Sequence, residues 1–84
     1  MYYLFSFRSR AESMAFFDST KKSGIASRLV STPREISIGC GLSVKIGDVD
    51  FNVAINLLEV CQAATFLGVF SDSTGSYNRV NYKL

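Results

Sequence analysis

The sequence predicts an α+β fold of the ferredoxin-like kind, β-α-β-β-α-β, with one sheet, two helices on one face and an optional extra edge strand at the C-terminus. Residues 2–7, 27–31, 42–46 and 65–70 are predicted strands, and apolar side chains alternate with period two in residues 2–7 and 42–46. Two stretches with helical spacing and capping signals follow the first and the third of these strands. Two right-handed crossovers around a β-hairpin then give a ferredoxin-like sandwich.

The chain opens with a strand and a clearly delimited helix. In residues 2–7 aromatic side chains occupy alternate positions and both faces are largely apolar, which predicts a central strand. Ser9 and Glu12 then form an S-x-x-E capping box, in which each side chain is expected to bond the other residue's backbone N–H. Gly24 is predicted to end the helix in the left-handed conformation, with Ile25 making the hydrophobic contact. The apolar stripe expected on this helix consists of Ala11, Met14, Ala15 and Phe17.

The middle of the chain holds two more predicted strands and an ambiguous connection. Residues 27–31 form a short second strand, which Pro33 ends. Residues 42–46 alternate cleanly, so the third strand begins just after Cys40. The segment 34–39 fits either a strand or a turn.

The second helix is expected to begin at a cap supplied by Asp48 or Asp50. Its apolar positions form one stripe: Val53, Ala54, Leu57, Leu58 and Cys61. The sequence predicts a fourth strand over residues 65–70 and a turn-rich loop over residues 71–76. Alternation in residues 79–84 predicts the optional edge strand.

Composition limits the classes of function. The 84 residues, 48% of them hydrophobic, predict a single domain over residues 1–84. Nine basic residues against seven acidic ones, scattered along the chain, are too weak a signal for nucleic-acid binding. Without a membrane-spanning apolar run or a signal peptide, we expect a cytoplasmic location with reduced thiols. The chain has no histidine, so we expect no four-ligand Cys/His zinc site and no bound metal.

The candidate functional residue is Cys40, which stands between Gly39 and Gly41 after the turn marked by Pro33. Flanking glycines remove side-chain bulk and allow positive φ, so that another molecule can approach the sulfur. Cys61 falls on the apolar stripe of the second helix and is interpreted as an inert core residue. The alternative for Cys40 is a small residue chosen for its size in a tight turn.

Chemistry at Cys40 requires a thiolate. A free cysteine thiol has a pKa of about 8.5, so it is mostly protonated at neutral pH. Arg34, six residues upstream, is a candidate for thiolate support, and Lys45 follows in the third strand. Backbone amides around Gly39 and Gly41 could add an anion-binding nest. Because no histidine can act as a base, a protease-like Cys-His pair is disfavoured. Sulfur exchange at a thiolate fits these residues better than hydrolysis.

The same residues carry a family resemblance. The block Thr32-Pro33-Arg34-Glu35-Ile36-Ser37 leading to Cys40-Gly41-Leu42 resembles a family of small bacterial proteins described as selenium/sulfur (Se/S) carrier-like. The similarity extends over the opening strand, the helix ending in Ser23-Gly24-Ile25, the cysteine loop and the second helix. The resemblance implies transient carriage of sulfur or selenium on Cys40. The chain lacks the Cys-Pro-x-Pro motif of the sulfur carriers of tRNA thiolation.

Two classes of function follow. The first is a carrier that holds a persulfide or selenopersulfide on Cys40 and needs no cofactor. On this interpretation the protein is a carrier or binding protein rather than a stand-alone enzyme. Its expected partners are a cysteine desulfurase or a selenium donor protein and an acceptor protein, with no nucleic acid and no membrane. The alternative is a non-enzymatic module that binds a small ligand or another protein. Because N-terminal and C-terminal aromatic residues exceed what two helices cover, we also expect a homodimer paired through the tail.

Overall fold

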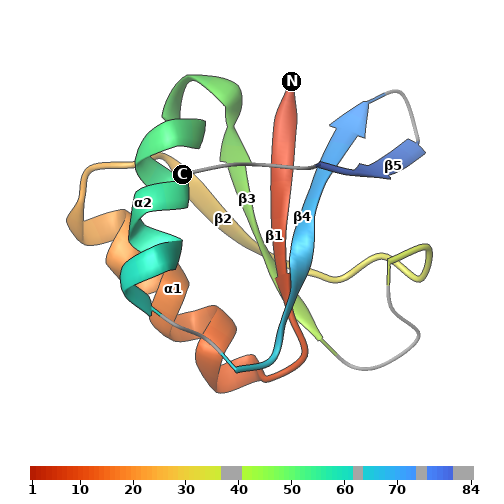
Figure 1. Cartoon of the computed structure of the whole chain (residues 1–84), viewed down its shortest axis with the longest axis horizontal. Helices are drawn as coiled ribbons and strands as arrows, with labels where there is room; N and C mark the ends of the chain where they lie inside the picture. The colour runs from red at the N-terminus through yellow and green to blue at the C-terminus, as the bar shows by residue number, and fades with distance from the viewer. Residues whose placement is uncertain (37–40, 62–63, 74–75, 81–84) are drawn as a thin grey trace.

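The computed structural model describes residues 1–36, 41–61, 64–73 and 76–80. Its strands form one antiparallel five-stranded sheet in the order β2-β3-β1-β4-β5, with both helices on one face (Figure 1). The elements are β1 Tyr2–Phe7, α1 Arg10–Lys22, β2 Ser27–Ser31, β3 Leu42–Gly47, the 3-10 turn η1 Asp48–Asp50, α2 Phe51–Cys61, β4 Phe66–Ser73 and β5 Ser76–Arg79. The first four strands have the ferredoxin-like arrangement that the sequence predicts, and β5 extends the sheet beyond β4.

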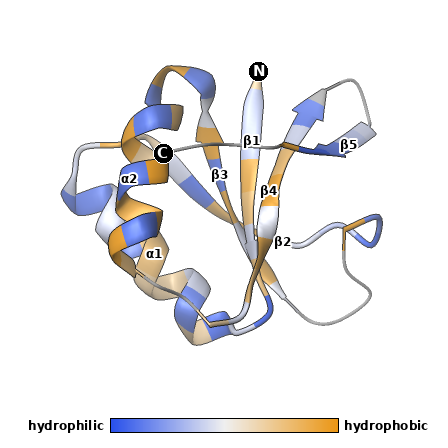
Figure 2. Ribbon diagram, in the orientation of Figure 1, coloured by the Kyte–Doolittle hydropathy of each residue, from blue (hydrophilic) through white to orange (hydrophobic). Residues whose placement is uncertain are grey.

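Strand β1 lies at the centre of the sheet, between β3 and β4, as predicted. Its side chains Phe5 and Phe7 are fully buried against the helices. Both rings contact Phe16 of α1, at ring-centroid distances of 5.3 and 5.5 Å. The hydrophobic stretches of β1, β3 and β4 consequently gather in the middle of the sheet (Figure 2).

Helix α1 buries a different stripe from the one that its apolar residues predict. The buried positions are Ser13, Phe16 and Thr20, whereas Met14 is 55% exposed. The predicted residues Ala11 and Ala15 are also exposed, and only Phe17 packs against the core. The predicted apolar stripe was therefore wrong except at Phe17, and the buried positions lie about half a helical turn away from its centre.

Hydrogen bonds explain how hydroxyl residues occupy the inner face of α1. The Ser13 hydroxyl lies within hydrogen-bond distance of the carbonyl oxygens of Ser9 (3.1 Å) and Leu42 (2.9 Å), which share its one proton. The Thr20 hydroxyl donates to the carbonyl oxygen of Phe17 (2.6 Å) and lies 2.8 Å from the hydroxyl of Ser27. A buried hydroxyl costs little when it is paired, so polarity alone misidentified the inner face.

The end of α1 follows the prediction. Gly24 has φ +81°, a conformation that glycine adopts without steric cost. Its N–H donates to the carbonyl of Lys21 (3.1 Å), and the N–H of Ile25 donates to the carbonyl of Thr20 (3.0 Å). These two bonds are a Schellman motif, and Ile25 is buried as its hydrophobic contact.

Helix α2 keeps part of its predicted stripe. Ala54 and Leu58 are buried as expected, but Ile55 replaces Val53, which is 47% exposed. The predicted aspartate cap is replaced by η1, whose N-cap is Gly47 with no side-chain cap bond. Phe51, Ala54, Ile55 and Leu58 follow the i, i+3, i+4, i+7 spacing of one helix face and pack in or against the core, and Val53 lies outside that face.

The C-terminal hairpin has a longer β4, an earlier β5 and a shorter loop than predicted. Residues 71–73 continue β4, and residue 76 already begins β5, so most of the predicted loop 71–76 is strand. These polar residues can form strands because β4 pairs with β1 as far as Asp72 and with β5 from Phe70 to Ser73. Of the predicted edge strand 79–84, residues 81–84 lie outside the described residues. Tyr77 is half-buried and Val80 packs against the core; the homodimer stays a prediction.

No helix in the described ranges is long and apolar enough to cross a membrane.

The start of α1 is tied to the connection between α2 and β4. The Ser9 hydroxyl accepts the N–H of Glu12 (3.2 Å), as in a capping box, but the N–H of Ser9 donates to the hydroxyl of Thr65 (3.0 Å). The Glu12 carboxylate accepts the N–H groups of Thr65 (2.9 Å) and Ala64 (3.2 Å) and the Thr65 hydroxyl. The reciprocal half of the predicted box is thus replaced by a link between two loops. The hydrogen bond from the Thr65 hydroxyl, followed by that from the Thr65 N–H, lowers the pKa of Glu12.

We expect Glu12→Gln to lower the melting temperature at neutral pH. We also expect the melting temperature of this variant to fall less steeply than that of the wild type as the pH is lowered. Because folding lowers the pKa of Glu12, its carboxylate stabilises the fold above the ordinary value of 4.5. This contribution is lost as the pH falls through the folded-state pKa. Thermal unfolding of both proteins between pH 7 and pH 3 measures the difference, with Glu59→Gln on the exposed side of α2 as the control. Parallel pH curves for wild type and Glu12→Gln would contradict the prediction.

Candidate functional site

Cys40 and Gly39 lie outside the described residues, as do residues 37 and 38. The structure does describe both flanks of the connection that contains them, residues 32–36 after β2 and Gly41 before β3. The candidate site is therefore built from these two flanks and from the strands that hold them.

Gly41 is fixed by close contact with the central strand. Its carbonyl accepts the N–H of Thr32 (3.1 Å), which continues the pairing of β2 with β3. A Cβ atom added at Gly41 would stand 2.7 Å from the carbonyl oxygen of Phe7 and 3.2 Å from Oγ1 of Thr32. Of the described glycines, only Gly24 and Gly68 have positive φ. Gly41 is thus required by the approach of the β1 backbone, rather than by the positive φ that its position beside Cys40 suggested.

A row of three hydroxyl groups runs beside Gly41, on the sheet face opposite the helices. Oγ1 of Thr32 lies 2.8 Å from Oγ of Ser43, which lies 2.8 Å from Oγ of Ser6. Ser6 and Ser43 are fully buried. Hydrogen-bonded hydroxyls in a buried setting polarise one another. The row therefore provides a rigid polar support that ends at the Thr32 hydroxyl, next to Gly41.

Arg34 lies in a turn. Of the segment 34–39, which fitted either a strand or a turn, the structure describes residues 34–36, and these form a turn. The N–H of Ile36 donates to the carbonyl of Pro33 (3.0 Å), and Arg34 is exposed. The charge of Glu35 contributes, after burial and the charge of Asp72, to raising the pKa of Tyr77. Neither of the two ion pairs among the described residues includes Arg34 or Glu35. The distance from Arg34 to Cys40 lies outside what the structure describes.

Lys45 is directed away from the cysteine connection. Its Nζ lies 3.7 Å from a carboxylate oxygen of Asp72 and 4.6 Å from the ring centre of Tyr2. Three residues along a strand separate it from Leu42, which is about 10 Å. Lys45 is thus engaged elsewhere, and Arg34 remains the candidate for thiolate support.

Cys61 is half-buried in the last turn of α2 and packs against the hydrophobic core. This agrees with its interpretation as a core residue.

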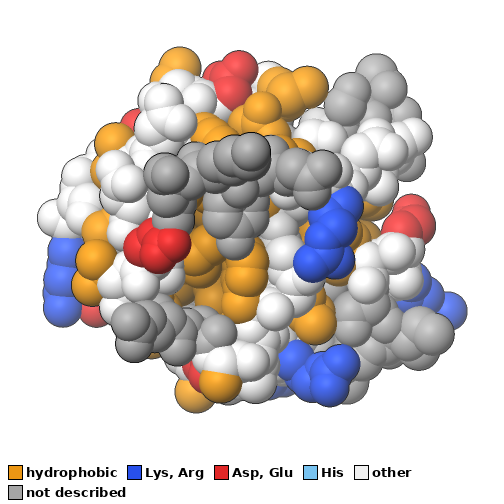
Figure 3. Space-filling model, viewed as in Figure 1, with side chains coloured by type: hydrophobic (Ala, Val, Ile, Leu, Met, Phe, Trp, Pro, Cys, Tyr) orange, Lys and Arg blue, Asp and Glu red, His pale blue; other side chains and the backbone are white. Residues whose placement is uncertain are grey.

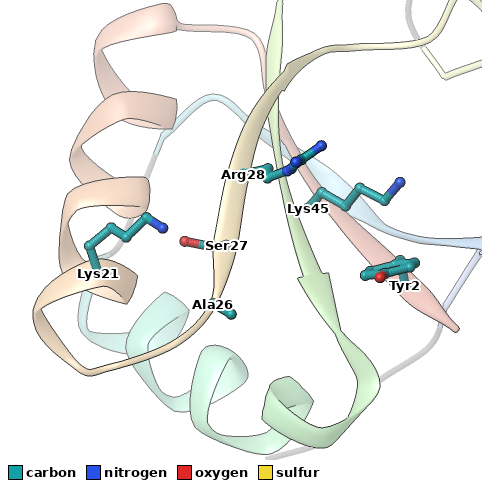
Figure 4. Close-up of a pocket in the computed structure, with 6 residues that line it drawn as sticks. All are labelled: Tyr2, Lys21, Ala26, Ser27, Arg28 and Lys45. Atoms are coloured by element: carbon teal, nitrogen blue, oxygen red, sulfur yellow. The ribbon is translucent and has the colours of Figure 1, made fainter.

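Sequence reasoning missed a basic hollow beside β2. Lys21, Arg28 and Lys45 are scattered in the sequence but line one hollow in the structure (Figure 4). The register of the β2–β3 hairpin places Arg28 opposite Lys45. A prediction of this register from the sequence would have brought the two cations together and indicated the hollow. On the face seen in Figure 3, by contrast, basic and acidic side chains are interspersed with hydrophobic ones.

The fold and the sequence together define a small ferredoxin-like α+β protein with a cysteine in the connection between β2 and β3. The family model described as "Putative Se/S carrier protein-like" matches residues 2–63, and the chain belongs to this family. The match covers β1 to α2 and includes Cys40, whereas β4 and β5 lie beyond it. No match to the chain was found among the curated proteins or among the solved structures.

Proposed function

We propose that this protein carries sulfur or selenium on Cys40, as a persulfide or selenopersulfide, between a donor protein and an acceptor protein. The observation that carries the proposal is membership of the Se/S carrier-like family over the segment that contains Cys40. A cysteine desulfurase or a selenium donor protein would supply the atom.

The proposed transfer needs only a thiolate. The Cys40 thiolate attacks the terminal sulfur of a donor persulfide, a new S–S bond forms, and the donor thiolate leaves with the electron pair of the bond that breaks. There is no net oxidation, and no histidine base is required. In the second transfer an acceptor thiolate attacks the terminal sulfur, and the Cys40 thiolate is the leaving group.

The described flank of the connection supports this role. Gly41 is held by Phe7 and Thr32, so the residue that follows Cys40 in the chain has a fixed position. We infer that the backbone around Gly39 and Gly41, together with Arg34, stabilises the thiolate.

The direct test is to load the protein and measure its intact mass. The protein is incubated with a cysteine desulfurase and cysteine, or with a selenocysteine lyase and selenocysteine. We expect the mass to rise by one sulfur or one selenium atom in the wild type and in Cys61→Ser, but not in Cys40→Ser. Loading that persists in Cys40→Ser, or that never occurs in the wild type, would refute the proposal.

Arg34→Ala is expected to raise the pKa of the Cys40 thiol, because it removes a positive charge that favours the thiolate. The rate of alkylation by iodoacetamide against pH, measured in a Cys61→Ser background, gives this pKa. Arg10→Ala, at the exposed start of α1, is the matched control and should leave it unchanged. An identical titration in Arg34→Ala and wild type would remove Arg34 from the site.

A further inference from the structure

The basic hollow beside β2 has a volume of about 420 Å³. Its lining residues are Tyr2, Lys21, Ala26, Ser27, Arg28 and Lys45, and no carboxylate of the described residues is among them. Lys45 is paired with Asp72, but neither ion pair in the described part of the chain includes Lys21 or Arg28. The hollow therefore favours a negatively charged ligand.

The hollow surrounds an edge of the sheet. Figure 4 shows Lys21 and Ser27 on one side of β2 and Arg28, Lys45 and Tyr2 on the other. Of the described strands, only β3 pairs with β2. The bond from Thr32 N–H to Gly41 fixes which residues face β3, since bonded pairs alternate along an antiparallel ladder. By this alternation the backbone groups of Ser27, Leu29 and Ser31 face away from the sheet.

We propose that the β2 edge docks an extended acidic segment of a partner protein, which adds a sixth strand to the sheet and places its carboxylates in the basic hollow. Main-chain hydrogen bonds would provide the affinity, and the cations would select the partner. Charge complementarity separates this occupant from a second copy of the chain. Pairing two β2 edges would bring together two sets of the same cations, which is a common device against self-association at sheet edges.

The proposed strand would link the hollow to the cysteine connection. Ser27 lies at the hollow, and the other end of β2, Ser31, pairs with Leu42 beside Gly41. Five residues of strand span about 16 Å, so a docked segment would extend from the hollow to the point where the connection joins β3. That the docked protein donates or receives sulfur rests on the proposed function; the docking itself does not.

The test uses Cys40→Ser protein, so that its result does not depend on sulfur loading. A fluorescein-labelled ten-residue peptide of alternating Glu and Val is titrated in, and anisotropy and amide chemical shifts are followed. We expect saturable binding, with the largest amide shifts at Ser27, Leu29 and Ser31. A Lys-Val peptide tests the charge, and a Glu-Val peptide of equal charge that is N-methylated at every residue, and so donates no backbone hydrogen bond, tests the backbone.

Two pairs of variants separate the backbone from the charge. Ser31→Pro removes an outward N–H that β3 does not use, and we expect about tenfold weaker binding, while Ser31→Ala binds normally. Arg28→Gln should weaken binding roughly threefold, whereas Lys22→Gln, whose lysine pairs with Asp18 on α1, should not.

Several results would overturn the docking proposal. These are equal binding of the N-methylated or the Lys-Val peptide, unchanged binding in Ser31→Pro, or sedimentation showing that a second copy occupies the β2 edge. If Cys40 fails to load but the Glu-Val peptide binds as described, the carrier function falls and the docking surface stands. If Cys40 loads but the Glu-Val peptide does not bind, the docking surface falls and the carrier function stands.

Discussion

Replacing Phe16 by alanine is expected to lower the free energy of unfolding by about 3–5 kcal/mol. The Phe16 side chain is fully buried and contacts the rings of Phe5 and Phe7, so its removal leaves a cavity between α1 and the central strand. Native domains have a free energy of unfolding of roughly 5–15 kcal/mol, so this substitution removes a large part of it. Urea denaturation followed by circular dichroism measures the change.

Met14→Ala is the matched control for Phe16→Ala. Met14 lies two residues earlier on α1 and is 55% exposed, so its truncation should change the free energy of unfolding by less than about 0.5 kcal/mol. The apolar stripe expected from the sequence makes the opposite prediction, because it places Met14 in the core. A larger loss in Met14→Ala than in Phe16→Ala would show that the orientation of α1 is wrong.

Gly41→Ala is expected to cost about 1–3 kcal/mol of stability and to slow the loading of Cys40. The added methyl group would stand 2.7 Å from the carbonyl oxygen of Phe7, which belongs to the central strand. Because β1 is paired on both sides, the start of β3 is the part that must shift. The residue next to Cys40 would then lose its fixed position. Urea denaturation measures the stability, and the time course of intact mass measures the loading.

Gly47→Ala provides the control at the other end of β3. No atom lies within 4 Å of the Cβ position at Gly47, and its φ of −71° suits any residue. We therefore expect Gly47→Ala to match the wild type in both measurements. Equal behaviour of Gly41→Ala and Gly47→Ala would mean that close packing at Gly41 does not position the cysteine connection.

The strands themselves and the ends of α1 were predictable because their signals are local. Alternation of apolar residues identifies a strand, and the Ser9 cap and Gly24 depend on the backbone within one helical turn. The inner face of α1 was not predictable in the same way. Ser13 can be buried because the carbonyl of Leu42, 29 positions later in the sequence, is a hydrogen-bond partner. Thr20 can be buried because Ser27, on the neighbouring strand β2, is another.

The candidate site shows the same division. The sequence points to Cys40 through its two glycines, but it does not show why Gly41 must lack a side chain, because the Phe7 carbonyl comes from another strand. The hydroxyl row and the basic hollow likewise depend on which residues the sheet places side by side. Lys45 was considered for the thiol from its distance along the chain, whereas its direction from β3 takes it to Asp72.

The place of β4 has a consequence for how the protein can be divided. The family match ends at residue 63, and β4, which begins at Phe66, pairs with the central strand along residues 2–7. A fragment cut at the end of the match would expose β1, whose residues 4–7 are buried, as an open edge, and would lose Val69 from the core. Recombinant fragments designed from the matched range alone should therefore aggregate, and β4 belongs in any soluble minimal version of the protein.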